Sequence, residues 1–185
     1  MGEQIEAPTV GDVVARRVRA LRKSQGDLKQ QELADRTAAL GYPMARATVA
    51  KIEAGGTRAQ NVSLIDVLVL AAALDVAPLL LFIPLGDEDA VKLTDNLILD
   101  PQLAIDWLAG EEPLAALPDN RARNIEAWHR NTLPVRLFRQ LRQLQRRARS
   151  EGTEEAKRAL EQHFGFMRDA GLMVSYLEEE QDGER

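Results

Sequence analysis

The stretch from residue 46 to residue 55, with the sequence RATVAKIEAG, limits the possible fold and function of this chain more than any other part. Val49 and Ile52, with Ala45 one turn earlier, have helical spacing and predict a helix with one buried stripe. Gly55 stands where helices commonly end in a left-handed residue. The outward positions are Arg46, Ala47, Ala50 and Lys51. Two long cations with little bulk between them suit a helix that lies in the major groove of DNA. Taken alone, the stretch favours an ordinary amphipathic helix with a solvated basic face, and its neighbours reverse that preference.

The amino-acid composition narrows the class of protein. Apolar residues make up 45% of the 185-residue chain, but aromatic residues make up only 4%. Strand-like alternation of apolar and polar residues is rare, so we expect a nearly all-α fold. The chain has no cysteine, which excludes disulfides and thiolate metal sites and fits a cytoplasmic protein.

We expect neither a secretory signal nor a membrane span. The chain begins Met-Gly-Glu-Gln, without the basic and apolar regions of a signal peptide. The longest apolar stretch, residues 67–85, is interrupted by Asp75 and Pro78. The expected location is therefore the cytoplasm, in association with the nucleoid.

The distribution of charge is more informative than its total. A net charge of −5 by itself argues mildly against binding to nucleic acid. Residues 1–85, however, carry a net charge of +1, and residues 86–185 carry −6. The acidic excess thus lies outside the half of the chain that holds the basic helix.

Apolar periodicity and capping residues predict five helices in the first 85 residues. They span about residues 10–25, 30–40, 46–55, 63–74 and 79–82. Thr9 and Ser63 are the expected N-caps of the first and fourth helices, and Pro43 marks the turn between the second and third. The inward residues expected in the fourth helix are Leu64, Val67, Leu68, Ala71 and Ala72. Residues 56–61 are expected to form a loop.

Three motifs within these helices resemble those of the Xre-type (phage-repressor-like) helix-turn-helix family of transcriptional regulators. Leu21-Arg22 followed by LKQQELA at residues 28–34 resembles the family's "LR…LTQEELA" pattern. TVAKIEAG at residues 48–55 resembles "TISRIERG", and residues 64–80 resemble the closing helices of the family. The turn at residues 38–44 is longer than is usual in the family and resembles regulators of this type that are common in actinobacteria. The resemblance covers residues 10–85 and implies a five-helix, repressor-like DNA-binding domain.

The resemblance also implies roles for individual residues. The DNA-binding candidates are Gln30, Arg46, Ala47, Thr48, Ala50, Lys51, Thr57 and Arg58. Arg46 can fork onto guanine, a contact worth about 1–3 kcal/mol of discrimination between bases. Arg22 and Glu53 occupy positions that the family pairs as a structural salt bridge, so neither is counted as a DNA contact. For each DNA-binding candidate the alternative is a solvated polar side chain.

In the second half of the chain, the sequence predicts a linker, a helix from Asp119 to about residue 129, and a pair of helices after it. Residues 86–118 are expected to form an acidic linker with a small hairpin and a short helix, and residues 119–185 a helical hairpin. Its two apolar seams are Leu137, Leu141, Leu144 and Ala148, and then Ala156, Leu160, His163, Met167, Ala170, Val174 and Leu177. Narrow seams of this kind pack helix on helix. A dimer through these helices would suit a pseudo-palindromic DNA site, although both helices can instead pack within their own domain.

Residues 136–149 hold six arginines and no acid. Such a stripe can follow DNA phosphates, or it can be solvated or pair with the acidic residues near the end of the chain. Of these alternatives, the sequence favours the face that is solvated or paired within the protein.

These observations lead to one expected function and two alternatives. We expect a sequence-specific transcriptional regulator, acting as a repressor, that binds double-stranded operator DNA as a homodimer. One alternative is an antitoxin or other protein-interaction factor whose C-terminal helices bind a partner protein. The other is a ligand-sensing regulator with a pocket near Trp107 and Trp128. We expect no enzyme, cofactor or metal site, because the chain has two histidines, His129 and His163, no phosphate-binding glycine-rich loop and no H-E-x-x-H motif.

Overall fold

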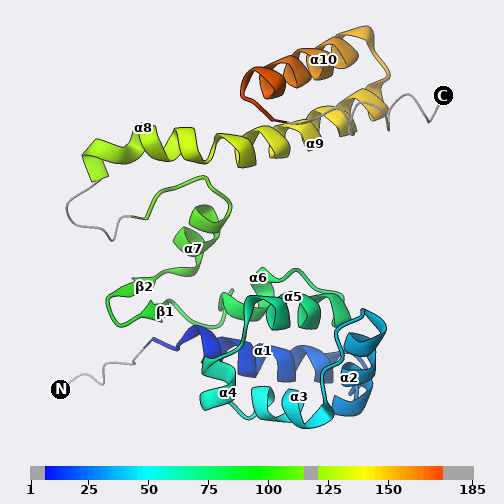
Figure 1. Ribbon diagram of the computed structural model, residues 1–185, viewed down its shortest axis with the longest axis vertical. Helices are drawn as coiled ribbons and strands as arrows, with labels where there is room; N and C mark the ends of the chain where they lie inside the picture. The colour runs from blue at the N-terminus through cyan, green and yellow to red at the C-terminus, as the bar shows by residue number, and fades with distance from the viewer. Residues whose placement is uncertain (1–6, 115–120, 173–185) are drawn as a thin grey trace. The chain divides into compact units, whose positions relative to one another are not determined.

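The structure of the protein is a computed structural model that describes residues 7–114 and 121–172. The described residues are mostly helical, with one two-stranded sheet, as Figure 1 shows. This agrees with the predicted helical class. Two compact units make up the chain, Met1–Ile105 and Asp106–Arg185.

The first unit begins with the predicted helices, close to their expected bounds. They are α1 (Val10–Ser24), α2 (Gln30–Ala39), α3 (Arg46–Glu53), α5 (Leu64–Ala73) and α6 (Leu79–Phe82). Thr9 caps α1 and Ser63 caps α5, each in a capping box with an aspartate three residues later. Residues 57–60 form a further short helix, α4 (Thr57–Gln60), where the sequence predicted a loop.

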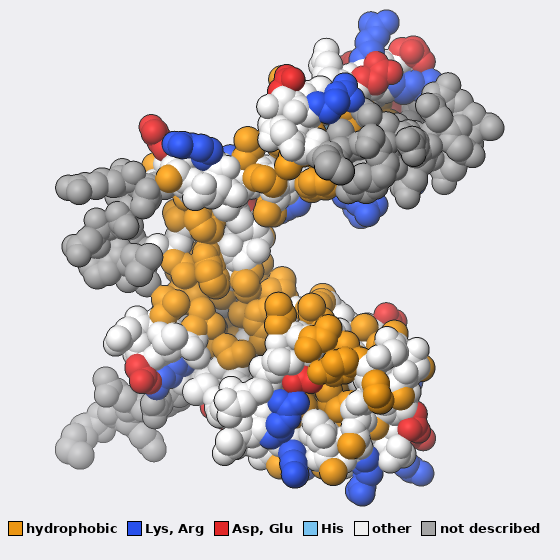
Figure 2. All heavy atoms as spheres, viewed as in Figure 1, with side chains coloured by type: hydrophobic (Ala, Val, Ile, Leu, Met, Phe, Trp, Pro, Cys, Tyr) orange, Lys and Arg blue, Asp and Glu red, His pale blue; other side chains and the backbone are white. Residues whose placement is uncertain are grey.

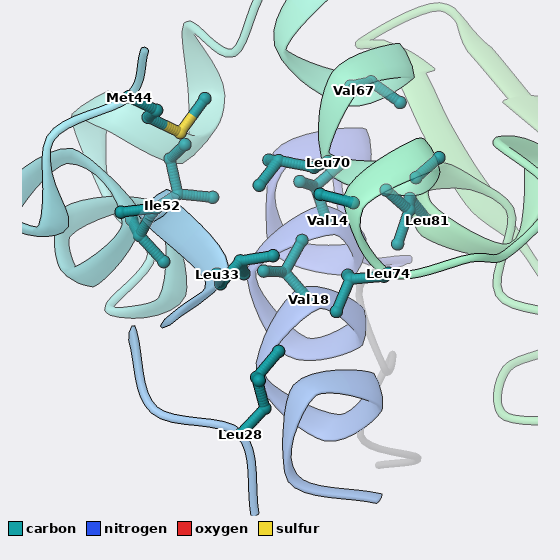
Figure 3. Close-up of a cluster of buried hydrophobic side chains, with 14 residues drawn as sticks. Val14, Val18, Leu28, Leu33, Met44, Ile52, Val67, Leu70, Leu74 and Leu81 are labelled. Atoms are coloured by element: carbon teal, nitrogen blue, oxygen red, sulfur yellow. The ribbon is translucent and has the colours of Figure 1, made fainter. Parts of the chain in front are cut away.

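The core of the first unit lies between α1 and the helices around it. Figure 3 shows Leu33 of α2 and Leu70 of α5 pointing toward Val14 and Val18 of α1. These four side chains have no exposed surface. Burial of this size contributes about 1.5–3 kcal/mol for each side chain. Val49 and Ile52 of α3 belong to the same buried cluster, so the core holds α2, α3 and α5 firmly against α1.

The buried face of α5 differs from the predicted one. Val67 and Ala71 are buried as expected, but Leu64 is 72% exposed and Leu68 is 41% exposed, and Ala72 is also exposed. The sequence LIDVLVLAAAL is apolar almost all round the helix, so its periodicity does not determine which face packs inward. Figure 2 shows exposed apolar side chains gathered on the surface of this unit.

A hairpin extends the first unit beyond residue 85. The antiparallel strands β1 (Val91–Thr94) and β2 (Leu97–Leu99) confirm the predicted hairpin. The backbone N–H of Lys92 donates to the carbonyl of Pro8 (2.8 Å). The acidic segment before the hairpin is not a free linker, because Glu88 pairs with Arg16 (2.6 Å) and Asp87 pairs with Arg17 (2.7 Å). The predicted linker therefore belongs in part to the first unit.

The division between the units falls within α7 (Pro101–Leu108), close to the predicted short helix. The second unit then contains α8 (Arg121–Asn131), α9 (Leu133–Glu151) and α10 (Glu154–Asp169). Gly152 adopts a left-handed conformation (φ 63°), which lets the chain turn back, and Thr153 caps α10.

The pair α9 and α10 confirms the predicted helical hairpin. Its core consists of Leu141, Leu160, Phe164 and Met167. The last helix is shorter than predicted: α10 ends at Asp169, Gly171 has a positive φ of 74°, and Ala170 is exposed. Val174 and Leu177, the last two predicted seam positions, lie outside the described residues.

Candidate nucleic-acid interface

The helix α3 has one fully buried face and one exposed face. Val49 and Ile52 are 0% exposed. On the other face Arg46, Ala47 and Lys51 are exposed, and Thr48 and Ala50 are half-buried. Within residues 7–114 and 121–172, the side chains of Arg46 and Lys51 have no hydrogen-bonded or ion-paired partner. The exposed face is therefore a small surface with two available cations.

A buried ion pair holds α3 against α1. Arg22 and Glu53 form two hydrogen bonds, from Nε to Oε1 (2.6 Å) and from Nη2 to Oε2 (2.9 Å). Arg22 Nη1 also donates to the carbonyl of Leu28. Both residues of the pair are buried. This confirms the structural salt bridge that the family resemblance implied, and it keeps both residues away from any DNA surface.

The same network includes Gln30, the first residue of α2. Its Nε2 donates to Glu53 Oε2 (2.8 Å), which links the start of α2 to the end of α3. The family resemblance implied a DNA contact for Gln30 and gave no indication of this bond. Because Gln30 is only half-buried, its contact with DNA stays a prediction beside its structural bond.

Two opposing effects act on the pKa of Glu53. Burial of the carboxyl raises its pKa, and the hydrogen bonds from Arg22 and Gln30, with the positive charges of Arg22 and Arg19, lower it. The second group of effects is larger, so the pKa of Glu53 lies below its ordinary value. The hydrogen bond to Glu53 correspondingly raises the pKa of Arg22, against the effect of burial.

The side chain of Arg58 binds other groups of the protein. Its Nη2 pairs with Asp66 Oδ2 (2.8 Å), and its Nη1 donates to the carbonyl of Asn61 (3.0 Å). Asp66 is buried and also accepts hydrogen bonds from Tyr42 Oη (3.1 Å) and Ser63 N (3.0 Å). The main contact of this guanidinium is therefore structural. It could not be predicted, because no local sequence pattern links Arg58 to Asp66.

The electrostatics of Asp66 follow the same rule as those of Glu53. Burial raises its pKa, but the hydrogen bonds from Arg58 and Ser63 outweigh burial, so the pKa of Asp66 is lowered. Asp66 thus remains ionised and holds Arg58 on the protein. Thr57, by contrast, is exposed at the start of α4.

Two exposed cations of α1 and α2 were not in the predicted set. Arg19 is exposed on α1, and its charge is one of the causes that lower the pKa of Glu53. Lys29 is exposed at the N-cap of α2, directly before Gln30. The sequence does not indicate which side of α1 faces α3, because that depends on how the helices pack.

The described parts of the chain contain no candidate metal centre. In these residues no group of three or more His, Asp or Glu side chains could hold a metal ion. His163 is buried in the α9–α10 hairpin, and its Nε2 donates to the carbonyl of Leu137 (2.8 Å). Trp107 and Trp128 are half-buried, and the indole Nε1 of Trp128 is a buried donor without a hydrogen-bond partner among the described residues.

None of the described helices combines the length and apolar character that crossing a membrane requires. A scan of family models, a search of curated proteins and a search of solved structures found no match to this chain.

Proposed function

We propose that this chain is a sequence-specific DNA-binding transcriptional regulator that uses α2 and α3 as a repressor-like helix-turn-helix. The observation that carries the proposal is the exposed face of α3, where Arg46 and Lys51 flank small side chains while Val49 and Ile52 anchor the opposite face. A helix held so firmly, with available cations outward, meets the requirements for entry into the major groove.

The spacing on α3 suits contacts with neighbouring base pairs. Arg46 and Lys51 are separated by about 7.5 Å along the helix axis at 1.5 Å per residue. This is about two base-pair steps of 3.4 Å. Arg46 can donate two hydrogen bonds to guanine, and Ala47 and Ala50 have no bulk to keep the helix from the bases. The expected site is therefore short and includes a guanine.

We also propose that the regulator is a homodimer through α9 and α10. Among the described residues, the core cluster of the hairpin is small, with Leu141, Leu160, Phe164 and Met167 buried, and Phe166 on α10 is 64% exposed. So small a core gains stability from a second copy, and a two-fold dimer places two reading helices on a pseudo-palindromic operator. Repression would follow where the operator overlaps a promoter.

The test of DNA recognition is a selection from random duplex DNA with the full chain, followed by affinity measurements on the selected duplex. Arg46→Ala and Lys51→Ala should each reduce discrimination between selected and random duplexes by about 5-fold to 150-fold, the equivalent of about 1–3 kcal/mol. Arg158→Ala, an exposed arginine of α10, is the matched control and should keep the parental discrimination. Failure of the parent chain to enrich any motif would refute sequence-specific recognition.

The test of the dimer is sedimentation of the full chain. Phe166→Ser should shift the chain toward monomer and reduce operator binding to that of a half-site. Glu161→Ser, an exposed position on the same helix, is the control and should leave the dimer intact. A monomeric parent, or a Phe166→Ser variant as dimeric as the parent, would contradict this part of the proposal.

A further inference from the structure

The helix α9 carries a regular row of arginines that the α9–α10 hairpin does not use for its core. Arg139, Arg142, Arg146 and Arg149 follow one another in steps of three, four and three residues and are all exposed. We call these four residues the arginine stripe. At 1.5 Å per residue the stripe extends about 15 Å along the helix.

The stripe lies on the side of α9 away from α10. The residues of α9 that pack in the hairpin are Leu137, Phe138, Leu141, Leu144 and Ala148. All of them except Phe138 form a second row along the helix, and Phe138 lies at the edge of that row. At about 100° of rotation per residue, the two rows are centred on opposite sides of the helix. The stripe therefore faces outward from the hairpin.

The surface around the stripe has the chemistry of a phosphate contact. Every exposed residue of α9 between positions 139 and 150 is Arg, Gln or Ser. These are side chains that commonly donate hydrogen bonds to DNA phosphates. A surface that packed against another protein would be expected to include exposed apolar residues. Between positions 139 and 150 of α9 there are none.

Acidic side chains of the same unit pair with only some of the arginines of α9. Arg139 pairs with Glu111, and Arg147, beside the stripe, pairs with Glu151 (2.9 Å). Among the residues that the structure describes, the side chains of Arg142 and Arg146 have no hydrogen-bonded or ion-paired partner. Like charges three or four residues apart destabilise a helix by about 0.2–0.5 kcal/mol per pair, so the row has a cost in the isolated protein that a bound anion would offset.

We infer that the arginine stripe binds the phosphate backbone of duplex DNA and adds a sequence-independent contact to the recognition by α3. The inference rests on the proposed function, because it assigns a second surface to the same ligand. The guanidinium groups can fork onto phosphate oxygens, and each phosphate they neutralise releases counterions. The stripe contributes affinity for any sequence, whereas α3 contributes the choice of sequence.

The test is the salt dependence of DNA binding by the full chain, measured on the selected duplex and on a random duplex. The double variant Arg142→Gln/Arg146→Gln should weaken binding to both duplexes by the same factor. Its slope of log K against log salt concentration should fall in magnitude by about 2, or about 0.9 for each lost phosphate contact. Arg142→Lys/Arg146→Lys, which keeps both charges, should restore the slope.

The matched control is Arg130→Gln/Arg158→Gln, which removes two exposed arginines of the same unit outside the stripe. It should keep the parental slope, and circular dichroism and sedimentation should show all variants to have the fold and association state of the parent. If Arg142→Gln/Arg146→Gln has the same slope of log K against log salt concentration as the parent, the inference is overturned. That result would point to an acidic protein as the partner of this surface. If Arg46→Ala still lost discrimination in that case, the proposed function would stand. A parent chain that bound no duplex at any salt concentration would overturn both.

Discussion

Replacing Glu53 with glutamine should leave the buried guanidinium of Arg22 without a countercharge. In the parent, two hydrogen bonds of 2.6 Å and 2.9 Å join the pair, and both residues are buried. The glutamine oxygen can still accept one bond from Arg22, and the carbonyl of Leu28 accepts another. What is lost is the negative charge that compensates a desolvated cation.

The expected loss of stability is about 3 kcal/mol, at the lower end of the 3–5 kcal/mol found when one partner of a buried ion pair is removed. This is a large part of the roughly 5–15 kcal/mol that stabilises a typical domain. Replacing both partners, as in Arg22→Met/Glu53→Leu, should recover most of the loss, because no buried charge then remains. Asp89→Asn, at an exposed position of the same unit, is the control and should change the stability by less than about 0.5 kcal/mol.

Amide hydrogen exchange of the full chain is the suitable assay. Tryptophan fluorescence does not report on this pair, because Trp107 and Trp128 both belong to the second unit. In the Glu53→Gln variant, the most protected amides of α1, α2 and α3 should exchange about 100-fold faster, because each 1.36 kcal/mol corresponds to a factor of ten. Amides of α9 and α10 provide an internal control and should be unchanged.

The pH dependence gives an independent check. The folded-state pKa of Glu53 is below its ordinary value, so its ionisation stabilises the fold above that ordinary value, and this stabilisation is lost as the pH falls through the folded pKa. Urea unfolding followed by circular dichroism should therefore show a smaller loss of stability on acidification in Glu53→Gln than in the parent. Equal exchange rates and equal acid dependence in the two proteins would refute the assigned role of the pair.

Two further predictions test the packing around the candidate interface. Gly11→Ala should destabilise the first unit by about 1–3 kcal/mol, although alanine favours helix, because the added Cβ would lie 2.8 Å from the backbone of Ala59 and Gln60; urea unfolding measures this, and a more stable variant would contradict it. Arg58→Ala should lower the free energy of unfolding by about 1–3 kcal/mol, because the buried carboxylate of Asp66 loses its countercharge. Its discrimination between selected and random duplexes should match the parent, and lost discrimination with unchanged stability would restore Arg58 to the DNA-binding set.

Much of the candidate interface followed from local sequence. The two faces of α3 were predictable because Val49 and Ile52 are its large apolar side chains and Arg46 and Lys51 its long cations, so only one rotation of the helix buries the first two. The Arg22–Glu53 pair followed from the family resemblance and is present. Whether α3 binds DNA stays a prediction, since exposure makes a side chain available without supplying a ligand.

Other parts of the interface could not be predicted. The resemblance assigned Arg58 and Gln30 to DNA, but each has a partner inside the protein, and the partners lie 8 and 23 residues away along the chain. Arg16 and Arg17 pair with acids 72 and 70 residues later. Rules of sequence spacing do not predict contacts between residues so far apart in the chain, because these contacts depend on how the helices are rotated and packed.

By itself, the sequence determined the helical class, the N-caps at Thr9 and Ser63, the hairpin of α9 and α10 and the outward cations of α3. The caps and the cations depend on residues within about one turn of one another, where backbone hydrogen bonds and side-chain spacing act directly. The hairpin depends on two apolar seams, each with helical spacing. Only the tertiary structure decided which face of α5 is buried and which arginines remain available. Those outcomes depend on the rotation and packing of whole helices, and a helix that is apolar all round, such as α5, does not determine its own rotation.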